Sequence, residues 1–582
     1  MRQARPIPAS SALLRVLCDL RGEKRPLSPP PQFTAQFLCR RRHSSKTSLR
    51  PGLRMLSDWK QMNSGAALPQ RLLWLAPVLL AAWRFYPITD NYFYGDDLYN
   101  LYEIVNHGLI EYLVKPYGMH LLAARNFVYF LSYRLFGTNA EPYFWIVLLT
   151  HLLNVFLLFQ ILRLLTGPRL ACFGAALWGM SPVGEGALGW FSVYGQVQAT
   201  TLILLVLYRL LRVAAGSVPA PGEPLLWGLL LLTASVSFGT GIGATMAFPV
   251  VAFVLLPPSL QRRRILLALV GVACALPVLY LASHRLAQIY QAPSTGQFGD
   301  AMGGILQLAP VLGLTARLIA YGVTGLLLGP FQYPLPYPSP VADVVPVVVL
   351  IAVAAALALA VPARRRALLA VLVLGFACYG IIAAGRVGFF RLFGTGIIAS
   401  ARYHYAAPVP FCIAFFVALD TLAQRRQLLA GWRDAALAVG LLVLAVAHAL
   451  TTPAIDHHAR ERMLAMKAVS SIHEQVDAAA PGTDVYLKNQ RFTGVGPLMI
   501  QRPDLFPGLA GIFAVYFPDN TVDGRRVYFM IWDPVTLAAA QHGRRSSTFV
   551  VPPSQRPAEA TPDEPPPSEA PPREEAPPPA SP

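Results

Sequence analysis

Two adjacent carboxylates, Asp96 and Asp97, lie in a charged stretch just after the first long apolar segment of the chain. Oxygen ligands of this kind could bind a divalent cation, or one carboxylate could act as a general base while its neighbour tunes the pKa. Because adjacent side chains seldom point in one direction, we expect only one of the two to react. The alternative is an Asp-rich turn or helix cap after Gly95.

A second acidic residue, Glu185, interrupts an otherwise uncharged run from Ser181 to Trp190. An ionisable side chain at the depth of a membrane span is costly and is often functional. The alternative is a solvated loop glutamate between flexible glycines. Glu185 is therefore the second candidate for a reacting or substrate-binding group.

A third group of candidates lies between residues 386 and 405, where three arginines accompany a tyrosine: Arg386, Arg391, Arg402 and Tyr403. The planar fork of arginine suits a phosphate group. The alternative is that a single arginine near a helix end extends toward lipid headgroups. Both interpretations of Arg402 stay open at this point.

Other conspicuous residues are expected to serve the fold. His151 and Asn154 lie one helical turn apart in an apolar segment, which predicts hydrogen bonds between helices. Gly239, Gly241 and Gly243 resemble a phosphate-binding loop only superficially, because no lysine follows them. We expect these glycines to serve a turn or close helix packing.

The elements that must position these residues are membrane helices. The chain has 582 residues, of which 54% are hydrophobic and only 13% charged, and its mean hydropathy is +0.46. This composition excludes an ordinary soluble protein. Uncharged stretches, most of them near the roughly 20 residues of a spanning helix, recur at 142–162, 186–208, 224–261, 265–283, 318–342, 344–363, 367–385 and 435–455. They are apolar on every face, which favours helices over a β-barrel.

The six cysteines show no paired spacing, so we expect neither a disulfide framework nor a zinc site.

Basic clusters mark cytosolic loops, and they recur near 163–169, 209–212, 262–264, 364–366 and 425–433. The spans between two such clusters must come in even numbers. Segment 306–329, which Arg317 interrupts, would be one span too many, so we interpret it as re-entrant or interfacial. The sequence thus predicts an all-α polytopic membrane protein with about eleven transmembrane helices in residues 72–455. The N-terminus lies inside, 89–141 form the first outer loop, and 456–582 lie outside.

The net charge of +18 is unevenly distributed, since residues 1–71 carry 14 Lys and Arg against 3 Asp and Glu. This leader is rich in Ser, Pro and Arg without periodicity, which predicts a disordered cytosolic segment and argues against a nucleic-acid partner. Residues 456–551 combine a helical stretch at 457–479 with strand-like runs at 484–488, 512–517 and 526–532, which predict a small α+β outer domain. Residues 552–582 contain 13 prolines and six acidic residues, a composition typical of a disordered tail.

Several motifs together resemble the GT-C superfamily of polytopic glycosyltransferases, most closely its protein O-mannosyltransferase-like members and their bacterial relatives. The resemblance covers residues 72–212 well and 386–423 loosely. It is carried by Gly95-Asp96-Asp97, by Tyr133-Arg134-Leu135-Phe136-Gly137-Thr138-Asn139-Ala140, by His151-Leu152-Leu153-Asn154, by the turn Leu165-Thr166-Gly167 and by Ser181-Pro182-Val183-Gly184-Glu185.

The resemblance implies roles for the candidate residues. In that superfamily an aspartate of the first outer loop acts as catalytic base or metal-associated group, which implies this role for Asp96 or Asp97. The acidic residue of the next outer loop corresponds to Glu185. Members take a sugar from a polyprenyl-phosphate carrier, and basic residues of later outer loops bind its phosphate, a role that falls on Arg402 with Tyr403, and on Arg386 and Arg391.

These expectations combine into one hypothesis. A carboxylate deprotonates an acceptor hydroxyl, and arginine, with or without a divalent cation, stabilises the departing phosphate at the outer membrane boundary, with inversion at the sugar. The partners would be the bilayer, the polyprenyl-phosphate-linked sugar and a glycan, lipid or protein acceptor. The alanine-rich, arginine-over-lysine composition favours a bacterial inner membrane with the site facing the periplasm. The competing hypotheses are a transporter or lipid-carrier flippase and a non-catalytic membrane scaffold.

Overall fold

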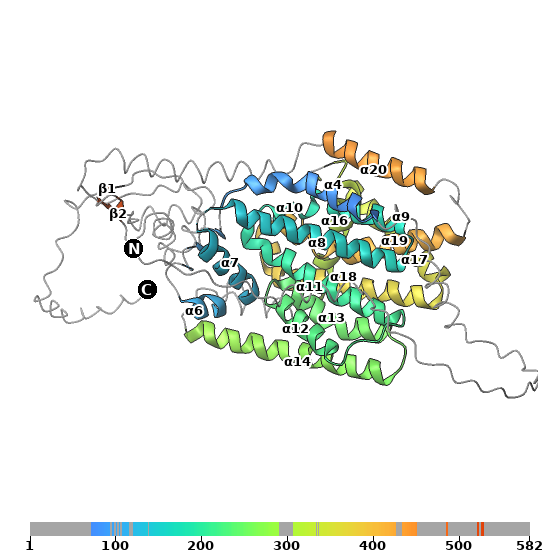
Figure 1. The fold of residues 1–582 in the computed structure, drawn as a ribbon, viewed down its shortest axis with the longest axis horizontal. Helices are drawn as coiled ribbons and strands as arrows, with labels where there is room; N and C mark the ends of the chain where they lie inside the picture. Colours follow the sequence, from blue (N-terminus) through green and yellow to red (C-terminus); the bar gives the residue numbers. More distant parts are fainter. Residues whose placement is uncertain are drawn as a thin grey trace, which may run out of the picture. The chain divides into compact units, whose positions relative to one another are not determined.

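A computed structural model describes residues 72–93, 96–97, 100–101, 104, 108–115, 120–137, 139–289, 307–332, 335, 337–425, 433–450, 485–486, 521–522 and 525–528. The described part is a bundle of helices (Figure 1). Its α-helices of more than five residues are α4 (Leu75–Phe85), α6 (Leu109–Val114), α7 (Ala123–Phe136), α8 (Glu141–Leu165), α9 (Pro168–Gly179), α11 (Tyr194–Ala214), α12 (Glu223–Ser235), α13 (Gly239–Leu255), α14 (Leu260–Ile289), α16 (Leu308–Leu328), α17 (Pro340–Leu359), α18 (Pro362–Phe393), α19 (Pro408–Arg425) and α20 (Arg433–Leu450).

Each apolar stretch that the sequence singled out overlaps at least one of these helices. Within the described residues, five helical segments are long and apolar enough to cross a membrane: Glu141–Leu165, Phe191–Ala214, Leu260–Ser283, Leu308–Leu328 and Pro362–Gly388. The chain is therefore an integral membrane protein. Helices α4 and α9 are shorter than the roughly 20 residues of a full span, and the total of eleven spans stays a prediction.

Helices α13 and α18 form the most extensive helix pair of the bundle. They approach closely because α13 carries glycines: a Cβ atom added at Gly243 would lie 2.3 Å from the carbonyl oxygen of Ala377 in α18. Gly241 allows a similar close approach to the end of α12, since a Cβ atom added there would lie 1.9 Å from the carbonyl oxygen of Ala234. The predicted packing role of these glycines is confirmed.

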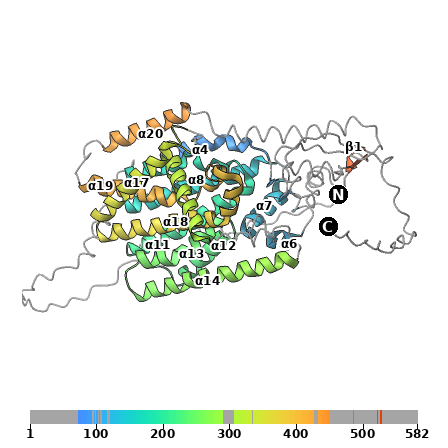
Figure 2. The same cartoon turned by 180° about the vertical axis from the view of Figure 1, so that it is seen from behind.

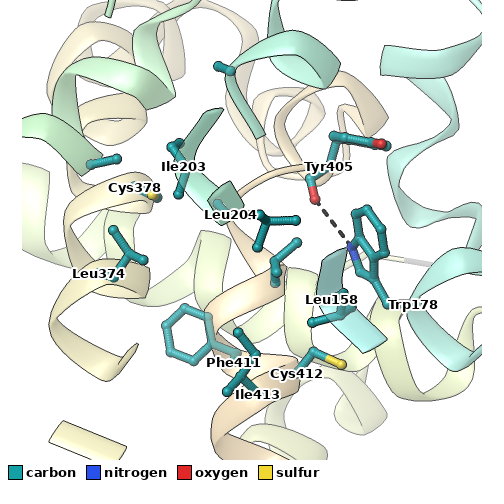
Figure 3. Packing of buried hydrophobic residues seen from close by; sticks show 14 of the residues in the cluster. Leu158, Trp178, Ile203, Leu204, Leu374, Cys378, Tyr405, Phe411, Cys412 and Ile413 are labelled. Carbon is teal, nitrogen blue, oxygen red and sulfur yellow. Dashed lines mark hydrogen bonds between the residues drawn. The ribbon is translucent and has the colours of Figure 1, made fainter. Parts of the chain in front are cut away.

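Buried apolar side chains of α8, α9, α11, α18 and α19 fill the middle of the bundle (Figure 3). Between α11, α18 and α19 they leave a small cavity whose lining includes Ile203, Leu374 and Ala406. Cys172, Cys274, Cys378 and Cys412 are free thiols. Among the described cysteines there is thus no disulfide bond.

Helix α16 runs antiparallel to α18, because the Arg317 guanidinium lies 5.5 Å from the ring centre of Phe390 and Gly322 lies against the hydroxyl of Tyr379. Helix α17 also runs antiparallel to α18, since only residues 360–361 separate the two helices and Arg365 Nε donates back to the Leu357 carbonyl at 2.9 Å. Helices α16 and α17 therefore have the same direction relative to α18, and α16 is one continuous apolar helix. Its placement in the membrane stays a prediction.

Three short strands follow the bundle in the chain. They are β1 (Val485–Tyr486), β2 (Thr521–Val522) and β3 (Arg525–Tyr528), in the order β1-β3-β2, with β1 parallel and β2 antiparallel to β3. Strands β1 and β3 overlap the runs predicted at 484–488 and 526–532. The predicted helix at 457–479, the strand at 512–517, the leader 1–71 and the tail 552–582 lie outside the described residues, so the α+β domain stays a prediction.

Helices α6 and α7, which lie within residues 89–141, are together at one end of the bundle, and α17 and α19 lie toward the other (Figures 1 and 2). The end with α6 and α7 contains the candidate residues.

Candidate functional site

A loop enclosed by helices is the centre of the candidate site. Between α9 and α11 the chain forms the short turns η2 (Pro182–Gly184), α10 (Glu185–Leu188) and η3 (Phe191–Val193). Every residue from 181 to 193 is buried except Trp190, which is half-buried. We call residues 181–193 the buried loop. The loop is enclosed because α9 ends at Gly179, beside Val155 in the middle of α8.

Small residues let the buried loop pass close to its neighbours. Ser181 Oγ accepts a hydrogen bond from the Val183 amide and lies 3.3 Å from the carbonyl oxygen of Gly325 in α16, to which it donates. A Cβ at Gly186 would lie 2.7 Å from the backbone nitrogen of Arg402. This contact places Glu185, which is only 6% exposed, directly beside the turn that carries Arg402. The solvated-loop alternative for Glu185 is therefore wrong.

Asp97 fixes the far end of the buried loop. Its side chain is fully buried, and Oδ1 accepts hydrogen bonds from the Ser192 amide at 2.7 Å, from the Ser192 hydroxyl at 2.6 Å and from the Tyr129 hydroxyl at 3.3 Å. Burial, followed by the charge of Asp97, raises the pKa of Tyr129 well above its usual value, so its hydroxyl stays a donor. This carboxylate is a hydrogen-bond acceptor inside the protein.

Arg125 of α7 holds the same serine from the other side. The guanidinium is 1% exposed and donates to the Ser192 carbonyl at 2.9 Å and to Asn100 Oδ1 at 2.7 Å. The Tyr112 hydroxyl donates to the same Asn100 oxygen at 3.0 Å. Sequence reasoning assigned no role to Arg125 or Ser192. The available signal was a cationic residue at the start of an otherwise apolar helical stretch.

The candidate phosphate-binding residues lie on the short turn η5 (Ala401–Tyr403). Gln196 Nε2 of α11 donates to the Arg402 carbonyl. The Arg402 guanidinium lies 5.7 Å from the centre of the Trp190 ring and 5.1 Å from that of the Tyr403 ring. The guanidinium of Arg386 lies 5.7 Å from the centre of the same Tyr403 ring. Among the described residues, the buried Tyr403 hydroxyl and Arg402 Nε have no hydrogen-bond partner. Buried polar atoms of this kind usually have one, so they are candidates for contact with a ligand.

The two residues after Tyr403 anchor this turn to three helices. His404 Nε2 donates to the Ile398 carbonyl at 2.6 Å, so Nδ1 accepts from the Tyr379 hydroxyl of α18 at 2.9 Å. His151 Nε2 likewise donates to the Gly179 carbonyl at 3.0 Å, and its Nδ1 accepts from the Tyr405 hydroxyl at 2.8 Å.

Asn154 completes this network, because its Nδ2 donates to the Tyr405 hydroxyl at 3.1 Å and to the Val197 carbonyl at 3.0 Å. The hydrogen bonds between helices predicted for His151 and Asn154 are confirmed.

The electrostatic environment of this end favours an anion. Burial, then the charges of Arg386 and Arg125, lower the pKa of His120 to about 3. The imidazole therefore stays neutral, while the arginines keep their charge. An anionic ligand would meet positive charge close to Tyr403.

The described residues do not build a metal site by themselves. No three His, Cys, Asp or Glu side chains gather anywhere in the described part of the chain. Asp97 Oδ1 already accepts three hydrogen bonds, and Asp96 is the half-buried member of the pair. A divalent cation at Asp96 stays a prediction, and no step below depends on it.

The structure thus brings most predicted site residues to one end of the bundle. Asp97 contacts the buried loop, Glu185 lies in it, and Arg402 and Tyr403 contact it. Arg386 joins them through Tyr403. Arg391 lies near the end of α18, but its side chain is outside the described part.

Comparison with known proteins gives only distant structural likenesses. No family model and no curated protein matches this sequence. Three solved structures of an oligosaccharyltransferase from Archaeoglobus fulgidus match: AglB in complex with an inhibitory peptide and a dolichol-phosphate, with TM-score 0.39 and 12% identity; the enzyme tethered to an acceptor peptide, with 0.35 and 13%; and its complex with Zn and sulfate, with 0.32 and 14%.

These matches cover 76%, 79% and 78% of this chain, and this chain spans 64%, 63% and 62% of the matched chains. Archaeal oligosaccharyltransferase is a GT-C superfamily glycosyltransferase, the superfamily that the sequence resembles. At TM-scores below 0.5 the likenesses carry no argument about this chain, and the function proposed below is argued from its own residues.

Proposed function

We propose that this protein is a membrane glycosyltransferase that moves a sugar, of the hexose type, from a polyprenyl-phosphate carrier to an acceptor hydroxyl. The observation that carries the proposal is the turn at Arg402 and Tyr403. A guanidinium nitrogen and a phenol hydroxyl are buried there without a hydrogen-bond partner among the described residues, and Gly186, the neighbour of the buried Glu185, contacts the same turn. A phosphate ester would supply acceptors to both groups.

The position of the turn inside an apolar bundle supports a lipid-linked donor. Ala406, three residues after Tyr403, lines the apolar cavity between α11, α18 and α19. A polyprenyl chain must stay in an apolar environment while its phosphate reaches charged groups. A free nucleotide sugar would not need its phosphate site at this depth.

The proposed reaction is a single displacement. A carboxylate of the first outer loop takes the proton of the acceptor hydroxyl, and the acceptor oxygen bonds to the anomeric carbon as the bond from that carbon to the phosphate oxygen breaks. The electron pair of the broken bond stays on the phosphate, where the fixed charges of Arg402 and Arg386 stabilise it. The sugar is inverted, and polyprenyl phosphate is the second product.

Glu185 lies close to this centre and to the arginine turn. Its charge is positioned to attract the partial positive charge that develops at the sugar ring as the bond to phosphate breaks. We assign it to stabilisation of the sugar rather than to proton transfer, because its side chain is buried and its neighbour Gly186 contacts the turn that carries Arg402. A periplasmic or equivalent outer face, and a glycan, lipid or protein acceptor, belong to the same proposal.

Binding of sugar-free polyprenyl phosphate to the purified full chain in nanodiscs tests the phosphate site. Fluorescence of Trp190, isolated as the difference from Trp190→Phe, reports on occupancy because the ring lies beside Arg402. We expect Arg402→Gln to weaken binding by about 10-fold to 100-fold, as for the loss of one charged hydrogen-bonding group. Arg134→Gln is the matched control, because Arg134 is exposed on α7 and its guanidinium lies 5.0 Å from the Phe130 ring of the same helix.

Transfer is then measured with a radiolabelled polyprenyl-phosphate hexose and membranes as the acceptor source. Loss of transfer in Arg402→Gln with normal insertion supports the enzyme. Equal binding by Arg402→Gln and wild type would contradict the phosphate site. Movement of the intact labelled lipid across the bilayer without release of its sugar would instead identify a flippase, and no effect on either process would identify a scaffold.

A further inference from the structure

All three polar backbone and side-chain groups of Ser192 are held by the first outer loop. Asp97 Oδ1 accepts from its amide and its hydroxyl, at 2.7 and 2.6 Å, and Arg125 donates to its carbonyl at 2.9 Å. The contacts join residues 95 and 67 positions apart in the chain. We call Asp97, Ser192 and Arg125 the serine clamp.

The chemistry of the clamp opposes proton transfer by Asp97. Two short hydrogen bonds from Ser192 already occupy Asp97 Oδ1, so this oxygen could take up a proton only by giving up contacts that hold the loop. The side chain is also fully buried, so an acceptor hydroxyl could not approach it without opening the clamp. Asp96 is the half-buried carboxylate of the pair.

The clamp is well placed to position the reacting groups. Ser192 lies seven residues after Glu185 and two after Trp190, and the short turns α10 and η3 make this stretch compact. The other end of the buried loop is fixed by Gly186 against Arg402. Movement of Ser192 would therefore change the position of Trp190 beneath the Arg402 guanidinium.

We propose that Asp97 and Arg125 are positioning residues that fix the buried loop through Ser192, and that Asp96 is the carboxylate that takes the acceptor proton. This assignment rests on the proposed function for the role of Asp96. The clamp itself is independent of any reaction.

Substitution of each aspartate by its isosteric amide separates hydrogen bonding from charge. In Asp97→Asn the amide oxygen can still accept from Ser192, so we expect sugar transfer within about 10-fold of wild type. Asp97→Ala removes the acceptor, and we expect transfer to fall at least 100-fold. Asp96→Asn removes the base, and we expect a loss of about 100-fold or more in kcat with an unchanged KM for the donor.

Two readouts do not depend on catalysis. The fluorine resonance of Trp190 in protein labelled with 5-fluorotryptophan, assigned by its loss in Trp190→Phe, should shift in Asp97→Ala and keep its position in Asp96→Asn. The unfolding temperatures of Asp97→Ala, Ser192→Ala and the double variant form a cycle. We expect non-additive losses, because both single changes break the same hydrogen bond.

Additive unfolding temperatures, together with an unmoved Trp190 resonance in Asp97→Ala, would overturn the clamp. An Asp97→Asn variant as inactive as Asp96→Asn, with wild-type stability and resonance, would show that Asp97 itself transfers the proton. If wild type transfers no sugar, the proposed function fails while the cycle and the resonance still decide on the clamp.

Discussion

Three tyrosines around the arginine turn differ in how their hydroxyls are hydrogen-bonded. Replacing each of them by phenylalanine should therefore change the free energy of unfolding by a different amount. Tyr403, Tyr379 and Tyr405 are all 2% exposed or less, so each change removes one oxygen and leaves a buried ring. The Tyr403 hydroxyl has no partner among the described residues. The Tyr379 hydroxyl donates to His404, and the Tyr405 hydroxyl both donates to His151 and accepts from Asn154.

The magnitudes follow from the groups that each change leaves unpaired. Tyr405→Phe deprives His151 Nδ1 of its donor, at about 1–3 kcal/mol, and removes one of two acceptors from the Asn154 amide, at about 1 kcal/mol more. The total is about 2–4 kcal/mol. Tyr379→Phe affects only His404 Nδ1 and should destabilise by about 1–3 kcal/mol. Tyr403→Phe removes a buried unpaired hydroxyl and should be neutral or stabilising.

Unfolding of the purified protein in mixed detergent and SDS micelles gives the free energy of unfolding for each variant. Polyprenyl phosphate binding is measured on the same samples. Tyr403→Phe should weaken binding without lowering stability, whereas Tyr405→Phe should lower both. A Tyr403→Phe protein destabilised by more than about 1 kcal/mol, or a Tyr405→Phe protein within about 0.5 kcal/mol of wild type, would refute the assignment of these hydroxyls.

Two further changes test the packing and the protonation states. Gly243→Ala should destabilise by about 1–3 kcal/mol, because its Cβ would lie 2.3 Å from the Ala377 carbonyl oxygen and must push α13 from α18. Gly271→Ala in α14, where nothing lies within 4 Å, should stabilise by up to about 1 kcal/mol in the same unfolding assay; equal effects would contradict the close approach. Burial lowers the pKa of His404 to about 4. Between pH 6.5 and 4 the imidazole is therefore protonated in the unfolded chain but neutral in the folded protein, so the free energy of unfolding decreases as the pH is lowered through this range. Between pH 7.5 and 5 His404 should contribute about 2 kcal/mol to this loss, so the loss should be smaller by about that amount in His404→Gln when unfolding is followed at both pH values.

The helices could be predicted because hydropathy acts over whole segments. Every apolar stretch of the sequence overlaps at least one helix. The buried loop could not be predicted in this way. Pro182, Gly184 and Gly186 are typical of an exposed turn, and only the short α9 and the close approach to Arg402 place it inside the bundle.

The different roles of single residues in the site could not be predicted from the sequence either. Asp96 and Asp97 are indistinguishable as sequence, and both were predicted as reacting or metal-binding groups. Their difference arises from Ser192, a residue without conspicuous chemistry that lies in a segment assigned to another loop. Long-range hydrogen bonds of this kind depend on the packing of α7 against α11, which local patterns do not encode.

The arginines of the bundle differ in whether the protein itself supplies their hydrogen-bond partners. At the other end of α18, Arg364 pairs with Asp420 at 2.9 Å, and Arg209 of α11 pairs with Glu223 at 2.5 Å. Arg125 is satisfied by a carbonyl and an amide oxygen. Arg402 differs, since its guanidinium lies 5.7 Å from the Trp190 ring and 5.1 Å from the Tyr403 ring while its buried Nε has no partner among the described residues. A buried N–H group that lacks a hydrogen-bond acceptor destabilises the folded chain, and binding of an anion would remove that penalty. This contrast within one molecule is why the arginine turn, rather than the acidic pair that is conspicuous in the sequence, defines the site.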